Sequence, residues 1–488
     1  MKRFLDIFAV VPLAAAVLMD ADFEAEWLTV SNLLYLLLLF AAIGFVWHAY
    51  RGDALDLAFV STLLVPYVLS CLLLIGLILT LNESGFPEPG RALKFGIVYL
   101  LSLFVVAANA EPIESLKRTV GYVLAFAIVL GAFFTHLPEI AVGSGLVGFA
   151  VRSGLLMGLC MFIFPRYVSR DAFLWTVGVI SAVVIAISLP VYVLGEYTLF
   201  GLSFELWGTR KMLPLVGVKF QLLESMFGNP NTMGGLAFAG TVGAAMAAHR
   251  SYINGSIPGV WLLPAGLFFL NGFGLYLSYS RAAWLAATVT LSLYGFYVLF
   301  GRNTVPIGFT AIVGGVVLLF AAMFLSIVEI STSGRFTLWG AGFRAIVDNP
   351  SLFGAGIIDP AEPLEPYLQG RYSGFSPHNS YVSIFLRAGL LGGLAYLVLT
   401  VGSVLYGAYI KSEVDVSMLA FATGFGIHHM FEAYTLYQYE FAAVCGAIVF
   451  GYLVLDGSPP LDEVPTASAL SSKLRGARNV NLSRGNRL

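Results

Sequence analysis

The chain is a succession of apolar runs, each about as long as the hydrocarbon core of a bilayer is thick. A helix of about 20 predominantly apolar residues crosses a membrane. Charged residues make up only 11% of the sequence, whereas a soluble domain has about 25%. We therefore predict an all-α polytopic membrane protein with about 12–14 transmembrane helices. The runs cover residues 4–19, 28–47, 57–81, 96–110, 119–135, 145–164, 172–194, 233–249, 259–279, 282–300, 305–327, 379–410, 418–434 and 435–455.

The first run allows two interpretations. Its sequence, MKRFLDIFAVVPLAAAVLM, has a basic start, a short apolar stretch and small residues. This composition is found in cleaved signal peptides as well as in first transmembrane helices. We predict a helix that is retained, and its removal would leave the remaining topology unchanged.

The distribution of lysine and arginine orients the helices. With the N-terminus in the cytoplasm, the cytoplasmic segments hold more than half of the 26 Lys and Arg residues, as the positive-inside rule requires. These segments are the N-terminus, the tail and the connections HAYRGD, EPIESLKR, PRYVSRD, HRSYINGS, GRNT and KSEVD. The tail, residues 456–488, is basic and lacks apolar periodicity, so we predict that it is cytoplasmic and disordered.

In this topology two long connections fall on the external face. Arg281, His378 and Glu432 lie at the external ends of helices. Because the charge rule does not itself require this clustering, we predict an external active or binding site. The predicted organisation is N-terminal transmembrane helices at 1–194, an external loop at 195–232, transmembrane helices at 233–327, a large external loop at 328–378 and C-terminal transmembrane helices at 379–455.

The larger external loop contains an amphipathic helical pattern. Its apolar side chains recur at helical spacing and are Phe336, Trp339, Phe343 and Ile346. Ser333 stands where an N-cap is expected and Pro350 follows the end, so we predict a helix over 334–348 along the outer membrane surface. Arg335 and Arg344 have an ordinary explanation, which is that long basic side chains reach the aqueous interface.

The segment SPHNSYVSIFLRAGLLGG, residues 376–393, carries an arginine inside an apolar helix. Such an arginine costs about 2.5–3.5 kcal/mol near the middle of a spanning helix, so it usually faces the protein interior and has a partner. Ser380, Ser383 and Arg387 are spaced to lie on one stripe of the helix. His378 precedes this stripe, and its position above Arg387 favours a functional role over a structural one.

Three further polar features allow a structural and a functional interpretation. Arg281, in LSYSRAAWLA, marks a tight external turn, where it either anchors the interface or binds an anionic group. Arg152, in FAVRSGLLMG, lies inside a helix and either joins an anion site or pairs with a carboxylate. In GIHHMFEAY, His428 and His429 are four and three residues before Glu432, so a His–Glu contact is geometrically easy.

The turn FGNPNTMGG ends the first external loop. Asn-Pro-Asn is a turn signal, and Asn231 or Thr232 could cap the following helix, whose first N–H groups favour an anion. The sequence contains no Walker A loop, no G-x-S-G and no external D-x-D, and nothing supports nucleic-acid binding. The three cysteines lie within apolar runs without metal-ligand spacing, so we predict neither a metal site nor a cofactor.

Four stretches, in order, make the chain resemble the O-antigen ligase and O-antigen polymerase family. They are FGNPNTMGGLAF, SYSRAAWLA, GRFTLWGAGFRAIVDNPSLFGAG and PHNSYVSIFLRAGLLGG, and the resemblance covers roughly residues 195–455. The family's functional residues match Arg281, Arg335 and His378. Lys219 stands where relatives often carry an arginine. Arg387 departs from the family, which often has an acidic residue at this place.

The resemblance implies a glycosyltransferase C-like enzyme of the plasma (inner) membrane. Such an enzyme transfers or polymerises a glycan from a polyprenyl phosphate or pyrophosphate carrier onto a hydroxyl of a glycan, lipid or protein acceptor at the external, periplasmic face. Attack opposite the leaving group would invert the anomeric centre. His378 or Glu432 would act as base, and Asn379 and Asn231 would support the site. The candidates for binding phosphate without a metal are Arg281, Arg335, Arg387, Lys219 and Arg152.

A multi-pass transporter or flippase of an anionic lipid-linked glycan or solute is the alternative. Arg152 and Arg387 could line its path. Against it, the sequence shows no inverted repeat of interrupted helices, and the polar residues collect outside rather than at the midplane. Formation of a new linkage from donor and acceptor by the purified protein would distinguish the two, because a carrier makes no bond.

Overall fold

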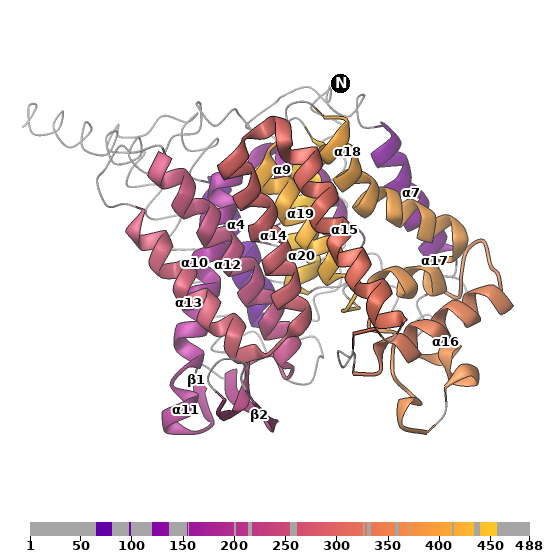
Figure 1. Cartoon of the computed structure of the whole chain (residues 1–488), viewed down its shortest axis with the longest axis horizontal. Coiled ribbons are helices and arrows are strands. Elements are labelled where there is room, and N and C mark those ends of the chain that lie inside the picture. Colours follow the sequence, from indigo (N-terminus) through magenta and orange to yellow (C-terminus); the bar gives the residue numbers. More distant parts are fainter. Residues whose placement is uncertain are drawn as a thin grey trace, which may run out of the picture. The chain divides into compact units, whose positions relative to one another are not determined.

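The computed structural model describes residues 65–80, 97–98, 120–135, 154, 156–199, 202–212, 217–253, 261–325, 327–328, 333–356, 361–368, 370–411, 414–433 and 440–455. The predicted runs at 4–19 and 28–47 and the tail at 456–488 lie outside these described residues. The chain divides into two compact units, whose elements are labelled in Figure 1. The first unit takes its described residues from Met1–Ile113, Phe162–Ser280 and Asp456–Leu488, and the second from Glu114–Met161 and Arg281–Leu455.

Helices of the first unit pack closely through small residues. They are α4 (Val65–Thr80), α9 (Phe164–Tyr167), α10 (Arg170–Ser188), α11 (Val191–Leu194), α12 (Pro230–Ile253) and α13 (Leu262–Ser278). Helices α10, α12 and α13 contact one another. A Cβ on Gly240 would lie 2.3 Å from Ser181 Oγ, and one on Gly274 would lie 2.5 Å from Ile185 Cδ1. Glycine thus permits the close approach that is usual between membrane helices.

An antiparallel sheet occupies most of the connection that the sequence predicts as an external loop at 195–232. Its strands are β1 (Tyr197–Leu199), β2 (Leu202–Met212) and β3 (Lys219–Ser225), in the order β1-β2-β3. The register between β2 and β3 shifts after Glu205 and again after Trp207. These irregularities interrupt the two-residue alternation by which a strand is recognised in a sequence. The all-α prediction is therefore corrected by this sheet.

The second unit is helical and holds most of the predicted site. Its α-helices are α7 (Val120–Phe134), α14 (Arg281–Phe300), α15 (Val305–Phe324), α16 (Arg335–Asp348), α17 (Ser380–Leu397), α18 (Ser403–Tyr409), α19 (Val416–His428) and α20 (Phe441–Val454). Shorter elements are the 3-10 helices η5 (Arg302–Thr304), η6 (Glu362–Tyr367) and η7 (Gly370–Tyr372), and the π-helix η8 (Val398–Gly402). A further π-helix, η4 (Leu159–Ile163), spans the boundary between the units. Helix α14 packs against α15 and α19, and α16 packs against α17 (Figure 1).

Four helical stretches among the described residues are long and apolar enough to cross a membrane, judged by length and composition. They are Arg170–Leu194, Arg281–Phe300, Arg302–Met323 and Ser380–Tyr409. Shorter apolar helices cover Val120–Phe133, Leu156–Tyr167, Leu262–Ser278, Val416–His428 and Phe441–Val454. All of these overlap apolar runs of the sequence, so the described chain is compatible with a polytopic membrane protein.

Helix α17 is interrupted at Gly389. This residue has φ 66° and ψ −163°, which are not helical values. The segment 351–356 supplies partners for the backbone groups around the interruption. Its bonds are Leu390 N to Ser351 O (2.9 Å), Leu391 N to Leu352 O (3.1 Å), Ala355 N to Leu386 O (2.9 Å) and Gly356 N to Arg387 O (2.8 Å). Non-helical backbone in a lipid-spanning segment requires such internal partners.

Two glycines make this junction possible. A Cβ on Gly389 would lie 2.4 Å from Gly354 N, and a Cβ on Gly354 would lie 2.4 Å from Arg387 C. Both glycines also have positive φ angles, a conformation that other residues adopt at a cost. The neighbouring corner between α16, η6 and α17 is filled by an apolar core of Leu338, Ala341, Ala345, Leu364, Leu368, Val382 and Leu386.

Candidate functional site

Asn379 caps the N-terminus of α17. Its Oδ1 accepts hydrogen bonds from Tyr381 N at 2.9 Å and from Val382 N at 3.1 Å, which is the usual action of an N-cap residue. His378 immediately precedes the cap and has φ 44°. A positive φ is uncommon for a residue other than glycine and often occurs at functional sites. The local backbone therefore fixes the half-buried imidazole of His378 at the mouth of the helix.

The segment that follows α19 is hydrogen-bonded to the N-terminus of α17. Ser380 N donates to His429 O at 2.8 Å, and Ser380 Oγ donates to the backbone oxygen of Glu432 at 2.7 Å. Both bonds are inaccessible to solvent, because Ser380 is fully buried. They hold Glu432 and His378 in a fixed arrangement, although the two residues are far apart in the sequence.

Arg335, the first residue of α16, forms an ion pair with Glu432. Its Nη2 lies 2.6 Å from Glu432 Oε1, and the two side chains are 17% and 6% exposed. The guanidinium carbon also lies 5.7 Å from the ring centre of Phe431, which is a cation–π distance. Trp339 packs on the same phenylalanine, with the ring centres 5.5 Å apart. The aromatic rings thus exclude water from one side of the ion pair.

In the described part of the chain, no side-chain hydrogen bond joins Glu432 to the imidazole of His428 or His429. Glu432 Oε1 accepts from Arg335 instead. Among the described residues, neither ring nitrogen of His429 has a hydrogen-bond partner, and this ring packs between Phe425 and Phe450. His429 contributes its backbone oxygen to the site, while the carboxylate of Glu432 binds Arg335.

Arg281, the first residue of α14, reaches the turn that precedes α16. Its Nη2 donates to Ser333 Oγ at 2.7 Å. Ser333 has φ 55° and the N-cap is Gly334, which makes no side-chain cap bond. The prediction that Ser333 caps α16 is therefore wrong, because its hydroxyl accepts from an arginine. Ser333, Gly334 and Arg335 are consecutive, so this turn brings two guanidinium groups into one region.

The charges of this site act on each other. Burial lowers the pKa of His378, and the positive charge of Arg335 lowers it further. Burial raises the pKa of Glu432, while the charge and hydrogen bond of Arg335 oppose that rise. Arg335 thus favours a neutral imidazole and an ionised carboxylate. We call Arg281, Arg335, His378 and Glu432 the Arg–His–Glu cluster.

Glu440 is an acidic residue of this region that the sequence did not reveal. It immediately precedes α20. Burial, together with the charge of Glu432, raises the pKa of Glu440 to about 8. In the described part of the chain its buried Oε2 has no hydrogen-bond partner. A glutamate before an apolar helix is common for electrostatic reasons alone, so the sequence offered no signal.

None of the side-chain bonds described above involves the remaining predicted site residues. Arg387 is half-buried on α17, two residues before the interruption. Lys219 is exposed at the start of β3, in the first unit. In the same unit Asn231 N donates to Asn229 Oδ1 at 2.8 Å, so Asn229 provides the cap predicted for Asn231 or its neighbour. Arg152 lies outside the described residues.

Comparison with protein-family models gives a match over part of the chain. A protein-family model described as O-antigen ligase matches residues 266–397. The matched region contains Arg281, Arg335 and His378, whereas Glu432 lies beyond its end. A search of curated proteins finds no match. Through residues 266–397 the chain is similar to the O-antigen ligase family, which supports an assignment to the O-antigen ligase and polymerase family.

Proposed function

We propose that the chain transfers or polymerises a glycan from a polyprenyl phosphate or pyrophosphate carrier onto an acceptor hydroxyl. The Arg–His–Glu cluster is the observation that supports this reaction. A lipid pyrophosphate is already a good leaving group, so its protein partner mainly has to stabilise the charge that develops on the phosphate oxygens. Arginine binds phosphate with paired N–H donors and does so without a metal.

In this proposal His378 is the base. Its neutral imidazole accepts the proton of the acceptor hydroxyl as the hydroxyl oxygen attacks the anomeric carbon of the donor sugar. The bond from that carbon to the phosphate oxygen breaks, and its electron pair leaves with the carrier phosphate. Arg281 and Arg335 bind the departing phosphate. Attack from the face opposite the leaving group inverts the anomeric centre.

Glu432 has a positioning role in this scheme. A guanidinium has five N–H donors, and the ion pair occupies one terminal nitrogen of Arg335. Glu432 therefore fixes the direction of Arg335 while other donors face the phosphate. Because the carboxylate is already bound to a cation, we assign proton transfer to His378 rather than to Glu432.

We place the cluster at the external, periplasmic face of the inner membrane, with both termini in the cytoplasm. Helix α16 supports a location at the membrane surface. It buries Ala341 and Ala345 against the protein, yet Phe343 and Val347 on its other side are 57% and 73% exposed. Large apolar side chains on the open side of a short helix suit the boundary between lipid headgroups and acyl chains.

The interruption of α17 favours a transporter as the second candidate, because transporters often bind substrates at broken helices. In this chain, however, the segment 351–356 bonds to the backbone around Gly389. Those backbone groups therefore serve the fold, whereas in a carrier they would coordinate an ion or substrate. This difference favours the transferase.

The decisive test is a reaction with purified protein, lipid-linked glycan donor and acceptor in lipid nanodiscs. We expect a new glycosidic linkage with inverted anomeric configuration by NMR, and its loss in His378→Ala. Arg344→Gln is the matched control, because Arg344 is exposed on the same helix as Arg335. Movement of glycan across the bilayer without a new bond would overturn the proposal.

The glycan profile of a deletion strain then separates the two forms of the reaction. Loss of long chains with single repeat units still attached would identify a polymerase. Loss of all attached glycan, with chains retained on the lipid carrier, would identify a ligase.

A further inference from the structure

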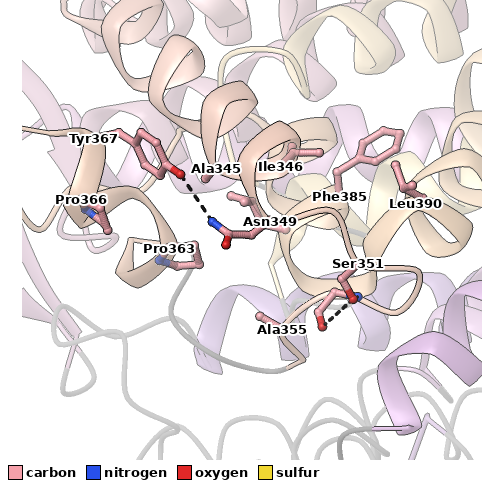
Figure 2. A pocket seen from close by; sticks show the side chains of 12 residues that line it. Ala345, Ile346, Asn349, Ser351, Ala355, Pro363, Pro366, Tyr367, Phe385 and Leu390 are labelled. Carbon is pink, nitrogen blue, oxygen red and sulfur yellow. Dashed lines mark hydrogen bonds between the residues drawn. The ribbon is translucent and has the colours of Figure 1, made fainter.

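A cavity of about 350 Å³ lies at the far end of α16 from the Arg–His–Glu cluster. Figure 2 shows that it is bounded by the last turn of α16, the 3-10 helix η6 and the junction at the interruption of α17. Its volume is within the range of small-ligand pockets. All of its lining residues belong to the second unit.

The cavity combines apolar walls with a few polar groups. Ile346, Phe385 and Leu390 contribute apolar side chains from α16 and α17. The opposite wall contains Pro363 and Pro366, whose rings are compact and apolar. Figure 2 shows these groups around the same space.

Three polar side chains line the same cavity. They belong to Asn349, Ser351 and Tyr367. Asn349 Nδ2 donates to Tyr367 Oη at 3.4 Å, which is long for such a bond. A hydroxyl group of a ligand could replace this weak contact with two shorter ones. Ser351 Oγ, which accepts from Gly354 N at 2.9 Å, is held at the junction.

The framework of the cavity is held by contacts within the protein. The apolar core beneath it includes Leu338, Leu364 and Leu386, with Tyr367 packed against this core. The four backbone bonds to segment 351–356 fix the other side. A preformed site of this kind spends little of its binding free energy on ordering the protein.

The lining residues identify the class of ligand. None of the described residues that line the cavity is a lysine or arginine, so this described lining offers no cation to bind phosphate. Apolar and aromatic surfaces accept the C–H faces of a sugar ring, and amide and hydroxyl groups bond to its hydroxyls. An uncharged sugar ring has both of these chemical features.

We propose that this cavity is a carbohydrate subsite, which holds an uncharged sugar ring of a glycan chain while another part of that chain reacts at the Arg–His–Glu cluster. The inference rests on the proposed function. Arg335 and Asn349 stand at opposite ends of α16, and at 1.5 Å per residue the helix places them about 20 Å apart. The subsite therefore binds the chain several sugar units away from the new bond and favours longer glycans over short ones.

Binding is tested on the full-length protein in nanodiscs. The probes are glycans released by mild acid from the host's own lipid carrier, sorted into single repeats and longer chains. Saturation-transfer NMR should show sugar protons in contact with the wild type. Asn349→Ala and Tyr367→Ala should weaken the binding of long chains about tenfold, the usual effect of losing one such hydrogen bond.

Val347→Ala is the matched control, because Val347 is 73% exposed on the same helix turn and does not line the cavity. It should bind like the wild type. If Tyr367→Ala proves unstable, Ala355→Leu fills the cavity from the junction instead. Unchanged long-chain binding in the folded cavity variants would overturn the subsite.

Kinetics identify which substrate enters the subsite. A raised KM for the lipid-linked donor with unchanged kcat assigns the cavity to the donor glycan, and a raised KM for the acceptor assigns it to the acceptor. His378→Ala should bind the released glycans normally while making no product. Binding without transfer by the wild type would refute the proposed function and leave the subsite in place, whereas transfer that is insensitive to the cavity variants would refute the subsite alone.

Discussion

Arg335 Nη2 and Glu432 Oε1 lie 2.6 Å apart in an ion pair that is largely withdrawn from solvent. The pair joins the first residue of α16 to the segment after α19, and that segment is bonded through Ser380 to the start of α17. The side chain of Glu432 thus binds α16, while the backbone of the same segment binds α17. Removal of one partner from a buried pair leaves a charge without compensation, whereas removal of both does not.

The first prediction concerns this ion pair. Arg335→Met should lower the free energy of unfolding by about 3–5 kcal/mol, because it leaves the carboxylate of Glu432 buried without its cation. The double variant Arg335→Met, Glu432→Leu should recover most of that loss, although it should not transfer glycan. Thermal unfolding in detergent and the transfer assay measure the two effects. A double variant as unstable as the single one would show that the pair is not the source of the stability.

The second prediction concerns pH. Because burial and Arg335 both lower the pKa of His378, the imidazole stays neutral below the ordinary histidine pKa of about 6.5. The kcat/KM of transfer should fall only when the pH drops through this lowered value. Arg335→Gln removes the positive charge, so the acid limb of its residual activity should move to higher pH. Arg335→Lys keeps the charge, and its acid limb should stay in place.

The third prediction concerns Ser333. Ser333→Gly removes the hydroxyl that accepts from Arg281 and tolerates the backbone φ of 55°. Loss of a bond to a charged group should lower kcat/KM by about ten- to a hundredfold, expressed mainly in the donor KM. Thr337→Ala is the control, since Thr337 is exposed on the same helix. Equal activity of the two variants would mean that Arg281 needs no support from this turn.

The fourth prediction concerns the interruption of α17. A methyl group on Gly389 would meet the backbone of Leu352 and Gly354 at 2.4–2.5 Å. Gly389→Ala should therefore lower the free energy of unfolding by about 1–3 kcal/mol or more, as overpacking does. Gly340→Ala on α16 has no neighbouring atom within 4 Å of its new Cβ. This control should leave transfer unchanged and should not lower the free energy of unfolding, because alanine favours a helix more than glycine does. A stable Gly389→Ala would contradict the tight junction.

The helices of the described chain were predictable because apolar runs and helix signals act locally. The predicted helix at 334–348 agrees with α16 to within a residue at its start. The start of α17 was likewise predictable from Asn379, whose short polar side chain is a strong N-cap. Arg281, Arg335 and His378 were predicted as site residues from motifs in which residue type and order carry the information.

Features that depend on partners distant in sequence were not predictable. Arg335 and its partner Glu432 are 97 positions apart in the sequence. The residues next to either one give no sign of the other. The sheet formed by β1, β2 and β3 is hidden by its shifts of register. Gly389 looks like an ordinary small residue of a membrane helix, and only the approach of segment 351–356 explains its φ angle.

The interruption of α17 also has a consequence for biosynthesis. The segment 351–356, which bonds to the backbone on both sides of Gly389, precedes α17 in the chain. Synthesis proceeds from the N-terminus, so this segment leaves the ribosome before the helix that it completes. The order of the sequence thus makes the bonding partner available before the helix that it completes.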